Sequence, residues 1–303
     1  MAPTLLILAA GIGSRYGGLK QIDRIGPSGE AIIDYSIHDA IRAGFGKIVF
    51  VVRRSIEDEV RDFFTDKLAG QIDMDFVCQE LDMVPHGISY PPGRGKPWGT
   101  AHAVWVAADK IKEPFLVINA DDFYGRDSFE KMVEYMTAES TVHNTKYCMI
   151  GYQVKHTLSD FGTVSRGICQ ADSNSFLQAV VERKEVWKEN GRFYYKNDEN
   201  KIVHLSGNEL VSMNIWGFTP EIFKHFEEQF IDFIRINAAD VKAELYIPTV
   251  INNLVQSGRG SVKILPSTGH LWFGITYKED KPIAEKKIRK LIKQGIYPDN
   301  LWA

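Results

Sequence analysis

A glycine-rich stretch near the start of the chain contains two cations whose spacing suits a phosphate-bearing ligand. The stretch covers residues 8–21 and begins at the end of an apolar run at residues 4–10. Small residues let the backbone approach a ligand and turn amide N–H groups toward phosphate oxygens. Arg15 and Lys20 add two positive charges that act on phosphate without proton transfer. The stretch therefore predicts a phosphate-binding loop after a buried strand.

Two common phosphate loops do not fit these residues. The dinucleotide fingerprint needs three glycines at set positions; Gly11 and Gly13 match the first two, but Tyr16 takes the third place. The Walker pattern needs a lysine directly after glycine, whereas here Leu19 stands before Lys20. The sequence thus argues against a nicotinamide-dependent enzyme and against a P-loop ATPase or GTPase.

The first 140 residues alternate between strand-like and helix-like segments. Short apolar runs predict buried strands at 4–10, 47–52, 74–79 and 115–119, and apolar residues at helical spacing predict helices at 32–41, 56–68, 100–110 and 128–139. This alternation predicts a parallel sheet with right-handed crossovers. A loop at residues 81–98 with four prolines and three glycines interrupts it, and loops of that length are often functional.

The second part of the chain has a different pattern, with strands and turns first and helices later. Strands are predicted at 146–154, 162–165, 175–186, 210–218 and 262–265, a hairpin at 192–202, and helices at 220–230, 241–255 and 285–294. We find no repeat, low-complexity tract or linker in the sequence. We therefore expect a single domain over residues 1–303, with one half at about 1–140 and the other at about 141–303.

Composition narrows the class of protein. The 303 residues are 44% hydrophobic and 25% charged, which is ordinary for a globular chain, and 36 basic against 39 acidic residues give a net charge of −3. That balance argues against a nucleic acid polymer as partner. Apolar runs fall short of the ~18 residues of a membrane span, so no membrane partner is expected. Three widely spaced cysteines suggest a reducing compartment, and we expect a cytoplasmic protein.

The glycine-rich stretch also carries a family resemblance. Residues 8–15 fit without a gap the pattern L-A-A-G-x-G-[ST]-R, followed by a lysine, and on this basis the chain resembles the sugar-phosphate nucleotidyltransferases. The resemblance implies an α/β fold: a Rossmann-like mixed, mostly parallel sheet with helices on both faces, of the nucleotide-diphospho-sugar transferase type. It further implies a magnesium-dependent reaction of nucleotide sugar biosynthesis, in which a nucleoside triphosphate and a sugar 1-phosphate give a nucleotide sugar and pyrophosphate.

The same resemblance assigns roles to individual residues in both halves. The first half would bind the nucleotide through Leu8, Ala10, Gly11, Gly13, Ser14, Gln79, Gly99 and Thr100. The second half would bind the sugar phosphate through Gly162, Glu182, Lys184 and Asn214. The catalytic residues would be Arg15, Lys20 and Asp121, the two cations holding the triphosphate and offsetting charge on the departing pyrophosphate.

The metal ligands are where this sequence departs from the family. Asp121 follows the predicted strand at 115–119, at the sheet edge where ligands bind, and Mg²⁺ takes one or two carboxylates from protein. Asp122 alternates to the other face and is expected to be structural. The family's second acid follows a late tryptophan, but Gly274 stands at that position. Asp280 is the substitute ligand we predict, although it also suits a helix start.

Gln79 and Gly99–Thr100 would face the base. A carboxamide donates and accepts together, so it suits a pyrimidine imide edge, and UTP or dTTP is expected, while a cytidine or purine nucleotide stays open. His102 is predicted to pack locally on the helix that begins at Thr100. Glu244 resembles a further sugar-contacting position, or else lies on a solvated helix face.

Three alternatives remain open at this point. One is a cytidylyltransferase acting on a polyol or aminoalcohol phosphate. Another is a non-catalytic subunit that senses nucleotide sugars, and Gly274 is its only support. The third, a glycosyltransferase with a similar sheet, would need an Asp-x-Asp motif that Asp121-Asp122-Phe123 does not supply. The resemblance also makes a homo-oligomer possible.

Overall fold

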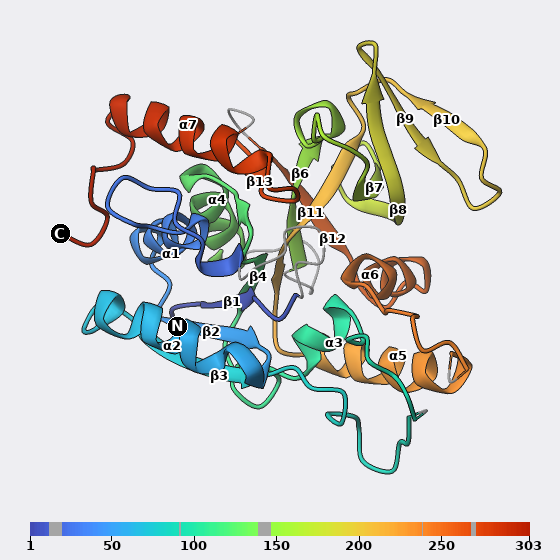
Figure 1. Ribbon diagram of the computed structural model, residues 1–303. Coiled ribbons are helices and arrows are strands. Elements are labelled where there is room, and N and C mark those ends of the chain that lie inside the picture. The colour runs from blue at the N-terminus through green and yellow to red at the C-terminus, as the bar shows by residue number, and fades with distance from the viewer. Residues whose placement is uncertain (12–19, 91, 139–146, 238, 268–270) are drawn as a thin grey trace.

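A large mixed sheet runs through both halves of the chain. The computed structural model describes residues 1–11, 20–90, 92–138, 147–237, 239–267 and 271–303 (Figure 1). Within them the strand order is β10-β9-β8-β7-β11-β4-β1-β2-β3, with β6 paired to β11 and β12 to β6. The strands of this sheet are β1 (Thr4–Leu8), β2 (Lys47–Val52), β3 (Asp73–Cys78), β4 (Phe115–Asn119), β6 (Tyr147–Gln153), β7 (Val164–Ala171), β8 (Leu177–Glu189), β9 (Arg192–Lys196), β10 (Ile202–Leu205), β11 (Leu210–Phe218) and β12 (Val262–Pro266).

Parallel pairing is concentrated in the first half. Strands β4, β1, β2 and β3 pair in parallel. The residues of β1, β2 and β4 are almost all apolar and buried, as expected where helices cover both faces, whereas β3, at the end of the strand order, is mostly half-buried. Strand β12 is parallel to β6, whereas β11 runs antiparallel to β4 and joins the two halves. Strands β7 to β10 are an antiparallel meander. The predicted Rossmann-like mixed sheet is therefore confirmed.

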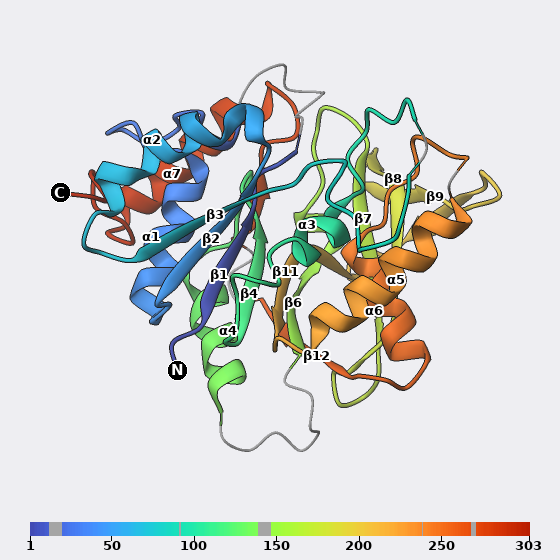
Figure 2. The same ribbon diagram turned by 90° about the horizontal axis from the view of Figure 1, so that it is seen from below.

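Helices cover both faces of the sheet (Figure 2). On one face, α1, α2 and α4 pack on Leu5, Ile7 and Phe50; on the other, α3, α5 and α6 pack on Leu6 and Val49. Helix α7 closes a smaller apolar cluster with α1 and the two-stranded sheet β5–β13. No helix in the described ranges is long and apolar enough to cross a lipid bilayer. These elements are α1 (Ile32–Ala43), α2 (Glu57–Leu68), α3 (Thr100–Trp105), α4 (Arg126–Thr137), α5 (Ile222–Ile236), α6 (Ile247–Gln256), α7 (Asp280–Lys293), β5 (Asp122–Phe123) and β13 (Phe273–Gly274).

Several segments differ from their predicted form: α5 extends to Ile236 and α7 begins already at Asp280. Helix α3 ends at Trp105 rather than near residue 110, and β7 extends to Ala171. The helix predicted at 241–255 begins only at Ile247. The later start of α6 follows from backbone pairing with a distant segment: the Leu245 amide donates to Trp98 O (2.8 Å) and the Leu245 carbonyl accepts from Ala101 N (3.0 Å), which holds the residues before α6 extended.

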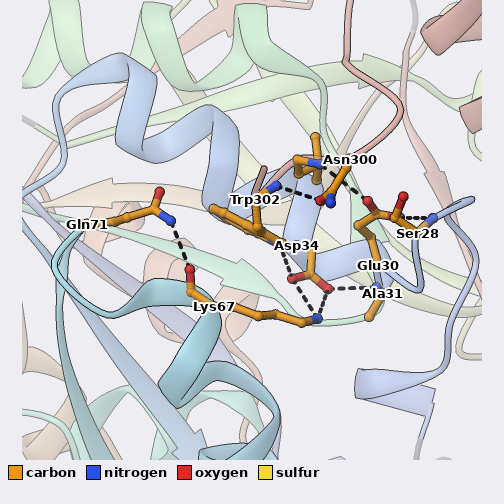
Figure 3. A network of polar contacts seen from close by, with 9 residues as sticks. Ser28, Glu30, Ala31, Asp34, Lys67, Gln71, Asn300 and Trp302 are labelled. Carbon is orange, nitrogen blue, oxygen red and sulfur yellow. Dashed lines mark hydrogen bonds and ion pairs between the residues drawn. The ribbon is translucent and has the colours of Figure 1, made fainter.

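A buried polar network fixes the C-terminus against α1 (Figure 3). The Asp34 carboxylate accepts hydrogen bonds from Ala31 N at 2.7 Å, Trp302 Nε1 at 2.8 Å and Lys67 Nζ at 3.2 Å. Burial raises the pKa of Asp34, and the Lys67 ammonium opposes that rise. Nearby, Glu30 accepts from the backbone N–H groups of Ser28 and Leu301. The C-terminal residues thus stabilise the segment that connects the glycine-rich stretch to α1.

We predict that Lys67→Met lowers the free energy of unfolding by about 3 kcal/mol, because it leaves the buried Asp34 without its charged partner. The control is Lys110→Met, which removes a partly exposed ion pair with Asp75 and should cost less than about 1 kcal/mol. Urea denaturation of both variants measures the difference. Equal losses in the two variants would contradict the importance of the Asp34 network.

Candidate active site

A cavity of about 490 Å³ lies where β1, β3 and β4 end. This is the edge of an open α/β sheet at which ligands generally bind. Eight residues predicted from the sequence line it: Leu8, Ala10, Gly11, Gln79, Gly99, Thr100, Asp121 and Asn214. Residues from both halves of the chain therefore meet in one space.

The phosphate loop enters this cavity at its first residues. Gly11 is exposed there, and a Cβ added to it would meet no atom within 4 Å. The predicted Gly13, Ser14 and Arg15 lie outside the described residues, and Lys20 begins the short 3₁₀ helix η1 (Lys20–Ile22).

Gln21 is a cavity residue that sequence reasoning did not select. Its Nε2 donates to Ala9 O at 3.0 Å and to Gly11 O at 2.8 Å. These bonds connect the two ends of the loop at its base. The signal available in the sequence was its position directly after Lys20.

Gln79 and Gly99 line the cavity and are hydrogen-bonded to each other. Gln79 Nε2 donates to Gly99 O at 2.9 Å and contacts His102 Nδ1 at 3.1 Å. Gly99 has φ +104°, and a Cβ there would overlap the Leu245 carbonyl oxygen, so only glycine fits. His102 is fully buried and stacks on Trp105, as local packing predicts, but it also has this polar contact.

The two adjacent aspartates have different environments. Asp121 lines the cavity beside Asn119, which the sequence analysis missed. Asp122 is buried, and its Oδ2 accepts hydrogen bonds from Asn119 Nδ2 at 2.9 Å and Tyr124 OH at 3.3 Å. In the described part of the chain, no three or more His, Cys, Asp or Glu side chains are grouped as a metal site. Of the residues described, Asp121 and Glu244 are the two carboxylates that line the cavity, and Glu244 is paired with Lys96.

The missing acid at position 274 has a structural explanation. Strand β13 pairs Gly274 directly with Asp122 of β5. A Cβ on Gly274 would overlap Asp122 Oδ1 and would lie 3.0 Å from the Trp272 ring. The Asp122 carboxylate thus occupies the space that a side chain at position 274 would need.

Asp280, the predicted substitute ligand, is not brought to Asp121. Its Oδ2 accepts from the backbone N–H groups of Thr276 (2.9 Å) and Tyr277 (2.7 Å), and its Oδ1 accepts from Ser159 Oγ (3.1 Å). It lines a separate cavity of about 220 Å³ at the start of α7. The alternative noted for Asp280, a helix start, matches these contacts.

A bulge in β11 projects Asn214 into the main cavity. The pairing of β11 with β6 shifts register between Ser212 and Trp216, and Asn214 has φ +57°. Asparagine is one of the few residues other than glycine that visit this conformation routinely. Bulges of this kind redirect a side chain next to a site.

The other predicted sugar-phosphate residues lie beside the cavity or apart from it. Lys184 Nζ lies 5.9 Å from the ring centre of Tyr246, a cavity residue. Glu182 is partly buried; burial raises its pKa to about 7, while Arg166 and Lys184 oppose the rise. Gly162 lies against Tyr277, whose hydroxyl would be 2.6 Å from a Cβ added there. Gly162 therefore belongs to the region of Asp280.

Two further charged residues from different loops meet at the cavity. Lys96 Nζ is 2.7 Å from Glu244 Oε2, which also accepts from Tyr246 OH at 2.8 Å. All three line the cavity. Glu244 is therefore not on a solvated helix face, and Lys96 is a contribution of the loop at 81–98 that the sequence did not reveal.

The mixed α/β sheet thus places Asn119, Asp121 and the start of the glycine-rich stretch together at the ends of its parallel strands β1 and β4. The chain belongs to the nucleotidyl transferase family, whose sequence model matches residues 5–232. No curated protein sequence matches it.

Solved structures show the same fold at low sequence identity. The inositol-1-phosphate CTP transferase from T. maritima is 13% identical with TM-score 0.64, covering 96% of this chain and 97% of that one. A UDP-glucose pyrophosphorylase complexed with UDP-glucose is 17% identical with TM-score 0.58, covering 96% and 99%. A putative glucose-1-phosphate thymidylyltransferase from Bacillus anthracis is 14% identical with TM-score 0.60, covering 95% and 96%.

We predict that Gly274→Asp destabilises the fold by about 2–3 kcal/mol. The new Cβ would overlap the Asp122 carboxylate, and the new carboxylate would place a second negative charge beside it. Gly95→Asp is the matched control, since a Cβ there meets no atom within 4 Å. In the double variant Gly274→Asp/Asp122→Gly, the two losses should not add. Thermal unfolding of the wild type, Gly274→Asp, Asp122→Gly, the double variant and the Gly95→Asp control tests this, and additive losses would show that the two positions do not share one space.

We also predict a pH dependence of stability that originates at Glu182. Its folded pKa of about 7 lies above its ordinary value of 4.5, so the folded state binds more protons between these values. Stability contributed by this group is present below pH 4.5 and is lost as pH rises through 7, by about 1–2 kcal/mol after allowance for partial exposure. Urea unfolding from pH 4.5 to 8 should show this loss in the wild type and a smaller one in Glu182→Gln. Glu185→Gln, an exposed change on the same strand, should keep the wild-type slope.

Proposed function

We propose that the protein joins a nucleoside triphosphate, UTP or dTTP, to a sugar 1-phosphate and releases pyrophosphate, as a step of nucleotide sugar biosynthesis. The observation that carries this proposal is the main cavity itself. It places the start of the phosphate loop, the Gln79–Gly99 pair, Asp121 and Asn214 around one space of about 490 Å³. Such a space suits two anionic substrates held side by side.

The residues divide the reaction between them. A sugar phosphate oxygen attacks the α-phosphorus, an O–P bond forms, and the bond to the β-phosphate oxygen breaks as pyrophosphate leaves. Transfer of this kind depends on positioning and on neutralising charge. Arg15 and Lys20 would bind the triphosphate. Asn214, with Lys184 beyond Tyr246, would orient the sugar phosphate.

Asp121 suits a magnesium ion in this cavity. Mg²⁺ prefers oxygen ligands and commonly completes its shell with phosphate oxygens and water, so one protein carboxylate is sufficient. When bound, the ion would neutralise charge on the phosphate oxygens. Asp121 would hold it, and the hydrogen bond from Asn119 to Asp122 keeps that second carboxylate in a structural position.

The direct test is pyrophosphate release across four triphosphates and a panel of sugar 1-phosphates and small alcohol phosphates. We expect one productive pair whose activity is lost with a chelator and restored by Mg²⁺. A productive pair of CTP with an alcohol phosphate would replace this proposal by the cytidylyltransferase alternative. Nucleotide-sugar binding without turnover across the whole panel would support the sensing subunit instead.

In the same assay, Asp121→Asn should lower turnover by about 100-fold or more, because it removes the carboxylate that would hold the ion. Asp66→Asn makes the same chemical change on the exposed face of α2 and should leave turnover unchanged. Magnesium titration of each variant completes the comparison. An unaltered magnesium dependence in Asp121→Asn would disprove the assignment.

A further inference from the structure

Gln79 stands between two cavities. It lines the main cavity and also a second one of about 480 Å³, whose wall includes Leu81 and Trp98 from the ends of the long loop. His102 lines this second cavity directly behind Gln79. The hydrogen bonds of these two side chains determine what Gln79 presents to a ligand.

The tautomer of His102 follows from its partner in the loop. His102 Nε2 lies 2.7 Å from Met83 O. A carbonyl oxygen only accepts hydrogen bonds, so Nε2 carries the hydrogen. Burial lowers the pKa of His102 to about 4, so the ring is neutral at neutral pH and Nδ1 is an acceptor.

Both N–H groups of the Gln79 amide are then occupied. One is donated to His102 Nδ1 at 3.1 Å and the other to Gly99 O at 2.9 Å. Turning the Gln79 amide by 180° would bring its oxygen next to Gly99 O, and two acceptor oxygens repel each other. In the described part of the chain, no hydrogen bond uses Gln79 Oε1. The sequence-based expectation that this carboxamide both donates and accepts toward a base is therefore corrected: it presents an acceptor.

We propose that His102 is a positioning residue that fixes Gln79 as a hydrogen-bond acceptor, so that the nucleotide site selects bases with a ring N–H at their pairing edge. Uracil, thymine and guanine have such a group. Cytosine and adenine have a lone pair on the equivalent ring nitrogen, and in the same pose two lone pairs would face each other. This inference rests on the proposed nucleotidyl transfer and specifies its nucleotide substrate.

The inference also gives a role to the loop at residues 81–98. The loop supplies Met83 O, and its own ends are fixed: Trp98 Nε1 donates to Leu81 O at 3.0 Å, and the Arg94 guanidinium lies 3.7 Å above the Trp98 ring. Arg94 Nη2 further donates to Pro97 O at 3.0 Å. Because the Met83 carbonyl is held in place, the hydrogen of His102 stays on Nε2, which donates to it.

The test compares kcat/KM for UTP, dTTP and GTP with that for CTP and ATP in the wild type, His102→Leu and His102→Asn. The wild type should favour its best ring-N–H base over CTP by about 10–100-fold, the usual value of one good base contact. His102→Leu frees a Gln79 N–H and should reduce that preference about tenfold. His102→Asn can still accept from Gln79 and should keep most of the preference.

A purely structural role for His102 predicts a different result. Activity would then fall equally with all bases and the ratio would stay constant, which would overturn the inference, as would a wild type that prefers CTP. Absence of both nucleotide binding and turnover would overturn the proposed function and this inference with it. If the enzyme turns over but the ratio of kcat/KM values between bases does not change in the His102 variants, this inference is overturned and the proposed function stands.

A second measurement determines the His102 tautomer in the wild-type protein and needs no activity from any variant. In wild-type protein labelled with ¹⁵N-histidine, NMR distinguishes protonated from unprotonated ring nitrogens, and the His102→Asn spectrum assigns the His102 signals among the eight histidines. We expect a hydrogen on Nε2 and none on Nδ1 at pH 7. A hydrogen on Nδ1 would overturn the inference.

Discussion

The close approach of Gly99 to Leu245 is the constraint on which the site depends. Two backbone hydrogen bonds, from Leu245 N to Trp98 O and from Ala101 N to Leu245 O, hold these distant segments together. They are possible because residue 99 has no Cβ and adopts φ +104°. The contact closes one wall of the cavity and joins the part near Gln79 to the part of the second half that carries Glu244 and Tyr246.

Local sequence signals were sufficient for most of the fold. Apolar runs gave β1, β2 and β4 within two residues, because strands buried on both faces need near-continuous apolar sequence. The segment before α6 was predicted as helix because its sequence has no strong break before Pro248. Its extended form depends on pairing with residues 98–101, a contact between segments more than 140 positions apart that local periodicity does not contain.

The site shows the same division between local and distant information. The glycine-rich stretch and the position of Asp121 after a strand could be recognised from neighbouring residues alone. The overlap of Asp122 with any side chain at position 274 could not be recognised in this way, because it depends on the pairing of two-residue strands 150 positions apart. Nor could the donor groups of Gln79 be counted without knowing that His102 and Gly99 O lie beside them. A motif identifies a residue type, whereas the partners of its polar atoms determine its chemistry.

The neutral pair of His102 and Gln79 and the charged group around Arg166 lie in different parts of the molecule. Beside Gln79, a neutral imidazole close to the Phe230 ring is hydrogen-bonded to a neutral amide, and under the proposed function the choice of base would depend on hydrogen-bond direction there. Near Glu182, the buried Arg166 interacts electrostatically with Asp122, Glu182 and Asp280, and burial lowers its pKa to about 10, so it stays charged at neutral pH. One guanidinium thus offsets carboxylates from three elements. The positive charge of Arg166 explains how the Asp122 carboxylate can be buried beside Gly274. Asp121, by contrast, lines the cavity, where it would meet the phosphates of the proposed substrates.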